Sequence, residues 1–249
     1  MRLKLVACEV VYREVCLCVA QSRNIVDVDF VSQGLHDLKN QDMCRRLQER
    51  VDAADPAKYQ AVALAYALCN NGVVGLTARS IPLVLPKAHD CITFFFGSRR
   101  AYQSYFDEHP GTYYRTTGWT ERDSVNLEPM KDGVMHQLGL DRTYHEYVEK
   151  YGEDNARYIM QVMGGWERNY KQCTYIDMGI REDLGYDAAA RDDAAQKGWS
   201  FDRIRGDLSL IRRLVDGEWD DDFLVVPPGH RVAASNDEGV LRVEPVPLG

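Results

Sequence analysis

Three cysteines of the sequence stand where apolar segments end. Cys8 ends LKLVAC, Cys69 ends AVALAYALC, and Cys91 comes a few residues after IPLVLP. His89 precedes Cys91 by two residues, so both side chains can reach one centre if the loop between them is not helical. Thiolates and imidazole are zinc ligands, and three thiolates can hold a four-iron cluster. These residue types therefore predict a cysteine-ligated metal site with one open coordination position.

Distant cysteines can share a site only if the fold brings their segments together. The first hundred residues alternate apolar, strand-like runs with amphipathic helical patterns. Such alternation predicts an α/β fold, with parallel strands and helices on both faces of the sheet. The loops after parallel strands gather at one edge, and ligands bind there at the point where the strand order switches. We therefore expect the three strand-end cysteines to converge at that edge.

The strand–helix pattern returns in the second half of the chain. The patterns predict a strand at CTYIDMG, a helix at YDAAARDDAAQKG, a helix at LSLIRRLVDGEWDDD and then a strand at FLVVPPGH. We expect two related Rossmann-like halves, at residues 1–110 and 141–249. The segment between them, residues 111–140, is rich in glycine, threonine and aromatic residues, and we interpret it as a crossover or lid. Its rings at Tyr113, Tyr114 and Trp119 either wall a pocket or form the junction between the halves.

Three further polar residues belong to the same predicted edge. Glu9 follows Cys8 directly, and His36 follows the second predicted strand. Glu9 and His36 are candidates for proton transfer, since the pKa of a histidine lies near neutrality. His36 is also an alternative to His89 as the fourth metal ligand, or else an ordinary loop histidine. Asp90 can cap the helix that begins just after it or orient His89.

Two glycine-containing turns are candidates for binding an anionic group or cofactor. Asn71 and Gly72 lie in CNNGVVGL, and Gly97 and Ser98 lie in GSRRAY. Such turns can present backbone N–H groups at a helix N-terminus, although an ordinary turn and helix cap is the alternative. Neither turn matches a dinucleotide-binding or P-loop motif, so we do not expect nucleotide binding.

The composition limits the class of protein and its partners. The chain has 249 residues and a net charge of −8, with a pI near 5.3. An acidic chain is a poor ligand for nucleic acid. No secretory signal or apolar run of about 18 residues is present, so we expect a cytoplasmic protein with no membrane association. In that compartment the seven cysteines are not expected to form disulfides. Four of them we assign to packing: Cys16, Cys18, Cys44 and Cys173.

Several motifs resemble one known family. The sequence resembles the domain of unknown function 1638 family over residues 3–229. The similar motifs are YALCNNGVVGL, IPLVLPKAHDCITFFFGS and GDLSLIRRLVDGEWDDDFLVVPPG. The chain departs mildly from its pattern at Ala67, where members usually carry glycine, and at Lys87, where arginine is frequent. Members are associated with anaerobes and methanogens, often near corrinoid-dependent methyltransferase systems. The resemblance implies a role in one-carbon or methyl-group metabolism, with corrinoid methyltransferase proteins as partners.

Three functions are open on these grounds. The first is a metalloenzyme in which zinc, or alternatively a 4Fe-4S cluster, activates a thiol or transfers a methyl group on a small anionic or thiol-bearing substrate. The second is a non-catalytic accessory protein that handles a metal or corrinoid, although the corrinoid motif D-x-H-x-x-G is absent. The third is metal-free chemistry, in which His89 activates Cys69 or Cys91 as a nucleophile. We favour the first, with zinc ahead of iron–sulfur.

Overall fold

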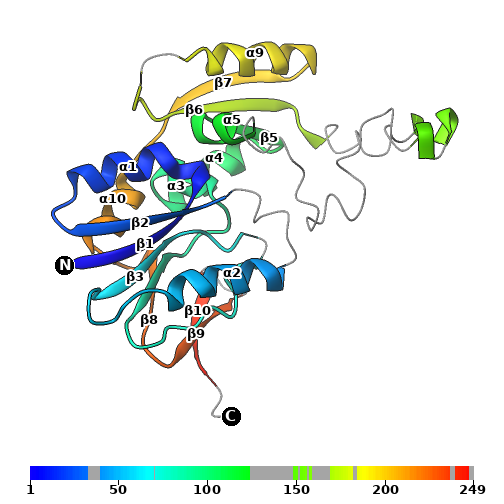
Figure 1. Cartoon of the computed structure of the whole chain (residues 1–249). Coiled ribbons are helices and arrows are strands. Elements are labelled where there is room, and N and C mark those ends of the chain that lie inside the picture. The colour runs from blue at the N-terminus through cyan, green and yellow to red at the C-terminus, as the bar shows by residue number, and fades with distance from the viewer. Residues whose placement is uncertain are drawn as a thin grey trace.

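The computed structural model has the predicted α/β architecture, with a mainly parallel sheet, a second, parallel sheet and a small hairpin (Figure 1). It describes residues 1–32, 40–69, 71–123, 148–150, 152–155, 157–158, 169–181, 184–235 and 239–246. The predicted fold class is confirmed. No helix among these residues is long and apolar enough to cross a membrane.

The first sheet has five strands in the order β2-β1-β3-β4-β8. Its strands are β1 (Arg2–Cys8), β2 (Ile25–Val31), β3 (Ala61–Ala65), β4 (Leu83–Pro86) and β8 (Phe223–Val226). The first four run parallel, and β8 runs antiparallel to β4. β3 and β4 are buried along their whole length. Their sequences AVALA and LVLP are apolar at every position, as is typical of central strands that are covered on both faces.

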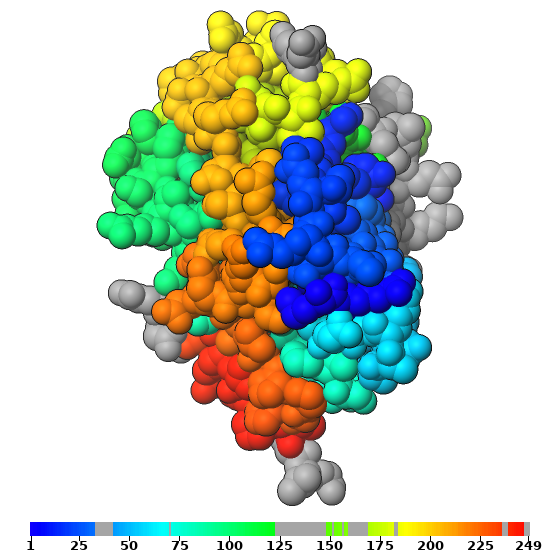
Figure 2. Space-filling model, turned by 90° about the vertical axis from the view of Figure 1, so that its left-hand side faces the viewer, coloured from blue at the N-terminus to red at the C-terminus, as the bar shows by residue number. Residues whose placement is uncertain are grey.

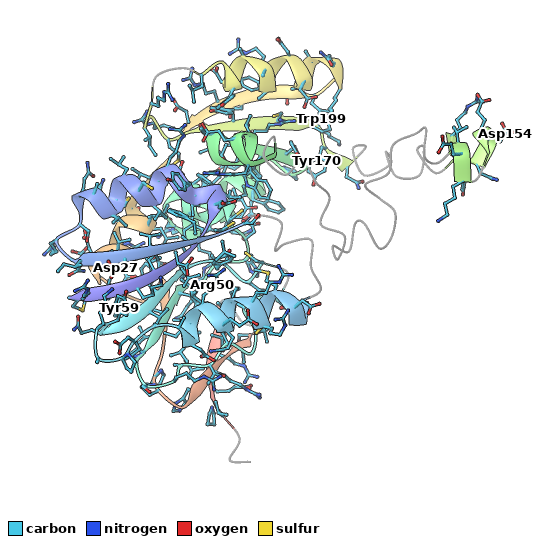
Figure 3. All side chains as sticks on the ribbon, viewed as in Figure 1. Asp27, Arg50, Tyr59, Asp154, Tyr170 and Trp199 are labelled. Atoms are coloured by element: carbon cyan, nitrogen blue, oxygen red, sulfur yellow. The ribbon has the colours of Figure 1, made fainter. Side chains whose placement is uncertain are left out.

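The edge strand β2 carries charge on its outward positions. Asp27 accepts a hydrogen bond from the Tyr59 hydroxyl at 2.8 Å and forms an ion pair with Lys58 at 2.7 Å (Figure 3). Asp29, two residues on, faces Lys4 at 3.6 Å. Charged, paired side chains of this kind prevent an exposed edge from joining another strand.

Helices cover both faces of the first sheet. α1 (Tyr12–Gln21) and α10 (Ser209–Asp216) lie side by side on one face, so that chain from the two ends of the sequence is in contact (Figure 2). α10 buries Leu210, Ile211, Leu214 and Val215, the spacing that turns one helical face to a core. α2 (Asn40–Asp52) lies on the other face (Figure 1).

The order of the strands creates a switch point. The chain passes from β1 through α1 to β2 on one side of β1, and then through α2 to β3 on the other side. The loops that leave β1 and β3 therefore diverge, and a crevice opens at their carboxyl ends. Cys8 is the last residue of β1, and Cys69 follows β3 by four residues.

The second sheet has three parallel strands, β5 (Thr112–Thr116), β6 (Gln172–Asp177) and β7 (Ser200–Arg205). α9 (Tyr186–Gln196) packs on β6 and β7. β5 lies within the segment that we interpreted as a crossover or lid, whereas residues 124–140 of that segment lie outside the described residues.

The second half of the chain also completes the first sheet. α10 and β8 both come from residues 141–249 and pack against β3 and β4. The chain then continues into a hairpin of β9 (His230–Ala234) and β10 (Leu241–Pro245). The first sheet is thus assembled from both ends of the sequence.

The two sheets meet through short helices at the end of β1. The 3-10 helix η1 (Glu9–Val11) follows β1 and packs against α5 (Thr117–Asp123), which follows β5. The contact is close at Gly118, where a Cβ atom would stand 1.7 Å from the carbonyl oxygen of Val10. Only glycine allows this approach without displacing backbone.

We predict that Gly118→Ala destabilises the protein by about 1–3 kcal/mol, because the added methyl group must push η1 away from α5. Gly229→Ala is the control: a Cβ atom there meets no atom within 4 Å, and only the left-handed backbone opposes it. Urea unfolding of both variants checks the prediction. Equal stability of Gly118→Ala and the wild type would contradict this contact.

Candidate functional site

The three predicted cysteines lie together at the switch point of the first sheet. Cys8, Cys69 and Cys91 are all buried, with 2%, 9% and 8% of their surface exposed. Burial raises the pKa of Cys91 well above its usual range, and the neighbouring Cys69 and Cys8 raise it further. Cys8 likewise contributes to the raised pKa of Cys69. The three thiols are therefore close enough to sense each other's charge.

Backbone hydrogen bonds join the loops that carry two of these thiols. Leu68 N–H donates to the carbonyl of Ala88 at 2.8 Å, and Cys69 N–H donates to the carbonyl of His89 at 3.1 Å. The loop after β3 is thereby fixed against the loop after β4. Cys69 adopts a left-handed conformation with φ of 46°, which is uncommon for a residue with a side chain and frequent at functional sites.

Polar neighbours act on two of the thiols. The main chain of Val10 and the side chain of Tyr66 lower the pKa of Cys8, and the side chain of Trp119 lowers that of Cys91. These contributions favour the thiolate form but do not outweigh desolvation, because the pKa of Cys8 is still raised to about 11. The pKa of Cys69 is raised to about 12, again mainly by burial.

Raised pKa values decide what these thiols can do. A thiol whose pKa is 11 or more is almost entirely protonated at neutral pH, and the nucleophile and metal ligand is the thiolate. A bound cation would lower all three pKa values, since its charge favours the thiolates. Within the described part of the chain, however, no three His, Cys, Asp or Glu side chains stand together in a geometry that could hold a metal ion.

His89 does not share a pocket with the thiols. It is exposed and lines a separate hollow of about 600 Å³ with Arg99 and Arg100, whereas Cys91 is buried. His36 lies outside the described residues.

The predicted acidic residues stand on either side of the thiols. Glu9 is half-buried in η1, beside Cys8. Asp90 caps α3 (Ile92–Phe96), because its Oδ1 accepts from Ile92 N–H at 3.0 Å, and its Oδ2 accepts from the Tyr102 hydroxyl at 3.1 Å. Burial raises the pKa of Asp90 despite these hydrogen bonds.

The four residues of the glycine-containing turns have structural contacts. Gly72 is packed so tightly that a Cβ atom would stand 2.1 Å from the sulfur of Met43, and Asn71 lines a hollow on α2, away from the thiols. Gly97 ends α3 in a left-handed conformation. Ser98 caps α4 (Arg99–Glu108) by accepting from Ala101 N–H at 3.1 Å.

An aromatic pocket borders Cys91. It has a volume of about 520 Å³, and Asp90 and Cys91 lie in its wall with the rings of Tyr113, Tyr114 and Trp119. The ring residues of the predicted lid therefore wall a pocket, and Tyr114 and Trp119 also pack against the core.

Tyr66, which lies beside Cys8, was not predicted as a site residue. A tyrosine inside the apolar run AVALAYALC could have indicated it, because its hydroxyl is a polar group in a predicted buried strand.

A buried carboxylate between the two sheets was also not predicted from the sequence. Glu14 of α1 is 1% exposed, and its Oε2 has no hydrogen-bond partner in the described residues. It lines a small cavity of about 40 Å³ together with Tyr175 and Asp177 of β6. Burial raises the pKa of Glu14 from 4.5 to about 7.

The fold and site define an α/β protein with three buried cysteines at the carboxyl-terminal edge of parallel strands. A family model described as "Protein of unknown function (DUF1638)" matches residues 30–215. The chain belongs to this family, which confirms the resemblance of its motifs. Neither the curated proteins nor the solved structures contain a match.

We predict that thiol-modifying reagents distinguish the cluster from the exposed Cys16. In folded, metal-free protein at pH 7.5, Cys16 should react roughly a hundredfold faster than Cys8, Cys69 or Cys91, because buried protonated thiols are poor nucleophiles. Mass spectrometry of peptides after timed labelling measures the rates. Labelling of Cys69 or Cys91 as fast as that of Cys16 would instead indicate an activated cysteine nucleophile.

We predict that Glu14→Gln stabilises the protein in a pH-dependent way. The raised pKa means that the folded state binds more protons than the unfolded state between pH 4.5 and about 7, so wild-type stability falls as the pH rises through that window. The variant lacks this penalty. Its advantage in urea unfolding should be small at pH 5 and about 3 kcal/mol at pH 8. The same difference at both pH values would show that Glu14 does not titrate in this range.

Proposed function

We propose that this protein is a cytoplasmic metalloenzyme in which Cys8, Cys69 and Cys91 bind zinc. One observation carries the proposal: three buried thiols follow three strand ends at the switch point of the sheet, where Cys8 raises the pKa of Cys69 and both raise the pKa of Cys91. Three buried thiolates would repel each other, and a bound soft divalent cation offsets this repulsion.

The donor set fits a site for chemistry better than a purely structural site. Three sulfur ligands leave one position open on tetrahedral zinc, whereas structural zinc sites are normally closed by four protein ligands. As the side chains stand they do not form a ligating group, so binding on this proposal requires the thiols to turn toward a common point. His36 is the remaining candidate for a fourth protein ligand, and its presence would favour a closed site.

Metal-free cysteine catalysis is less consistent with the site. A nucleophilic cysteine needs a lowered pKa and an adjacent base. Here burial raises the pKa of all three thiols, and His89 lies in a different hollow. This comparison favours a role for the thiols as ligands.

The reaction that suits this site is thiol activation or methyl transfer. Bound zinc supplies a lowered pKa for a substrate thiol, so that the thiolate forms at neutral pH. Glu9 and Asp90, which flank the cluster, are the groups available to accept the thiol proton. In a transfer, the sulfur–carbon bond forms as the bond between the methyl group and its donor breaks, with that electron pair leaving on the donor. A role in methyl-group metabolism beside a corrinoid methyltransferase is what the resemblance to the family's members implies, since those members are associated with corrinoid-dependent methyltransferase systems.

The test is the metal and sulfide content of protein purified without oxygen. We predict about one zinc per chain in the wild type, and loss of most of it in Cys8→Ser, Cys69→Ser and Cys91→Ser. Cys16→Ser is the matched control and should keep its zinc, because Cys16 is exposed on α1. Circular dichroism shows whether each variant folds.

Other results lead to other functions. Iron together with sulfide and a brown colour would indicate that the site holds an iron–sulfur cluster with one open iron, and not zinc. Metal in the site without turnover of any methyl donor and thiol would indicate an accessory protein. No metal after purification or reconstitution would contradict the proposal.

A further inference from the structure

The pocket beside Cys91 is walled mainly by aromatic rings. Its ring residues come from α4, β5 and α5 and from the chain just before β6, where Tyr170 is labelled in Figure 3. They are Tyr102, Phe106, Tyr113, Tyr114, Trp119 and Tyr170.

Neighbouring rings in this wall stand nearly perpendicular to each other. Tyr102 meets Tyr114 at 76° and Phe106 at 73°, with ring centres 5.6 and 6.2 Å apart. Tyr113 meets Tyr170 at 84°. Rings in different orientations therefore line one pocket, which we call the aromatic cage, and the face of an aromatic ring attracts a cation.

The charge of the pocket has one sign. Asp90 is the acidic residue in its wall, and no lysine, arginine or histidine lines it among the described residues. Asp90 forms no ion pair in the described part of the chain; its oxygens accept from Ile92 N–H and the Tyr102 hydroxyl. A half-buried carboxylate without a cationic partner is complementary to a positively charged ligand.

We propose that this pocket binds the methylated ammonium group of a small molecule. The ring faces attract the delocalised positive charge, the methyl groups fill apolar space, and Asp90 supplies the countercharge. A volume of about 520 Å³ suits a small molecule. The inference deepens the proposed function and rests on it for its catalytic meaning, since Cys91 lies in the wall and a methyl group held there would be next to the metal site.

The same observations argue against an anionic group at this position. Arg99 and Arg100, which form no ion pair within the described part of the chain, line the hollow that contains His89, with Gln103 and Ser104 of α4. The aromatic pocket instead faces Tyr102 and Phe106 of that helix. An anionic substrate group would therefore meet Asp90 in the pocket without a compensating cation.

The test compares choline with 3,3-dimethylbutan-1-ol, in which a carbon atom replaces the charged nitrogen. Isothermal titration of the full chain should show choline binding at least about tenfold more tightly than the neutral analogue, because the shapes match and only the charge differs. Asp90→Asn, which removes the charge with little change of shape and leaves one oxygen to accept a hydrogen bond, and Tyr114→Leu should each weaken choline binding by about tenfold. Asp107→Asn is the control, since Asp107 is an exposed carboxylate of α4 that does not line the pocket.

The titration is run on metal-free and on zinc-loaded protein, so that the two proposals fail separately. Selective choline binding by a protein that takes up no metal would support the cage and contradict the metal centre. Equal binding of choline and its neutral analogue, or binding of neither, would overturn the cage whatever the metal content. Displacement of choline by inorganic phosphate would also overturn it, because it would place an anion site in the pocket.

Discussion

The reversal of strand order between β1 and β3 is the constraint on which the site depends. Because β2 and β3 lie on opposite sides of β1, the loops that leave β1 and β3 separate and expose an edge between them. Cys8 and Cys69 occupy that edge, and β4 brings Cys91 to it from the next position in the sheet. The second sheet then closes over it through η1 and α5, where Gly118 lets the backbones touch.

Closure of this edge has an electrostatic consequence. Burial keeps the three thiols protonated and raises the pKa of the adjacent Asp90, so the site favours neutral forms unless a cation is present. Two cations would correct this in different ways: a metal ion among the sulfurs and a methylated ammonium group in the aromatic pocket. Both proposals thus follow from one property of the site, an excess of buried groups that become negative on ionisation.

The strands and the cysteine cluster could be predicted because apolar runs define buried parallel strands, and residues after such strands share an edge. The direction of β8 could not be predicted, because a short apolar run such as FLVV has the same pattern in a parallel and in an antiparallel strand. β5 was not predicted as a strand, because TYYRT lies in a segment that we interpreted as a crossover or lid from its glycine, threonine and aromatic residues; in the structure Tyr114 packs on Phe96 and Tyr102. His89 was placed with Cys91 on spacing alone, but it is exposed and lines a different hollow, whereas Cys91 is buried.

The central claim is that three strand ends deliver three sulfur ligands to one metal ion. X-ray absorption at the zinc edge of protein purified without oxygen tests it most directly, because it counts the sulfur neighbours of the metal. We predict three sulfur atoms at about 2.3 Å and one lighter atom. A zinc ion surrounded only by nitrogen and oxygen, or protein that holds no zinc, would contradict the claim.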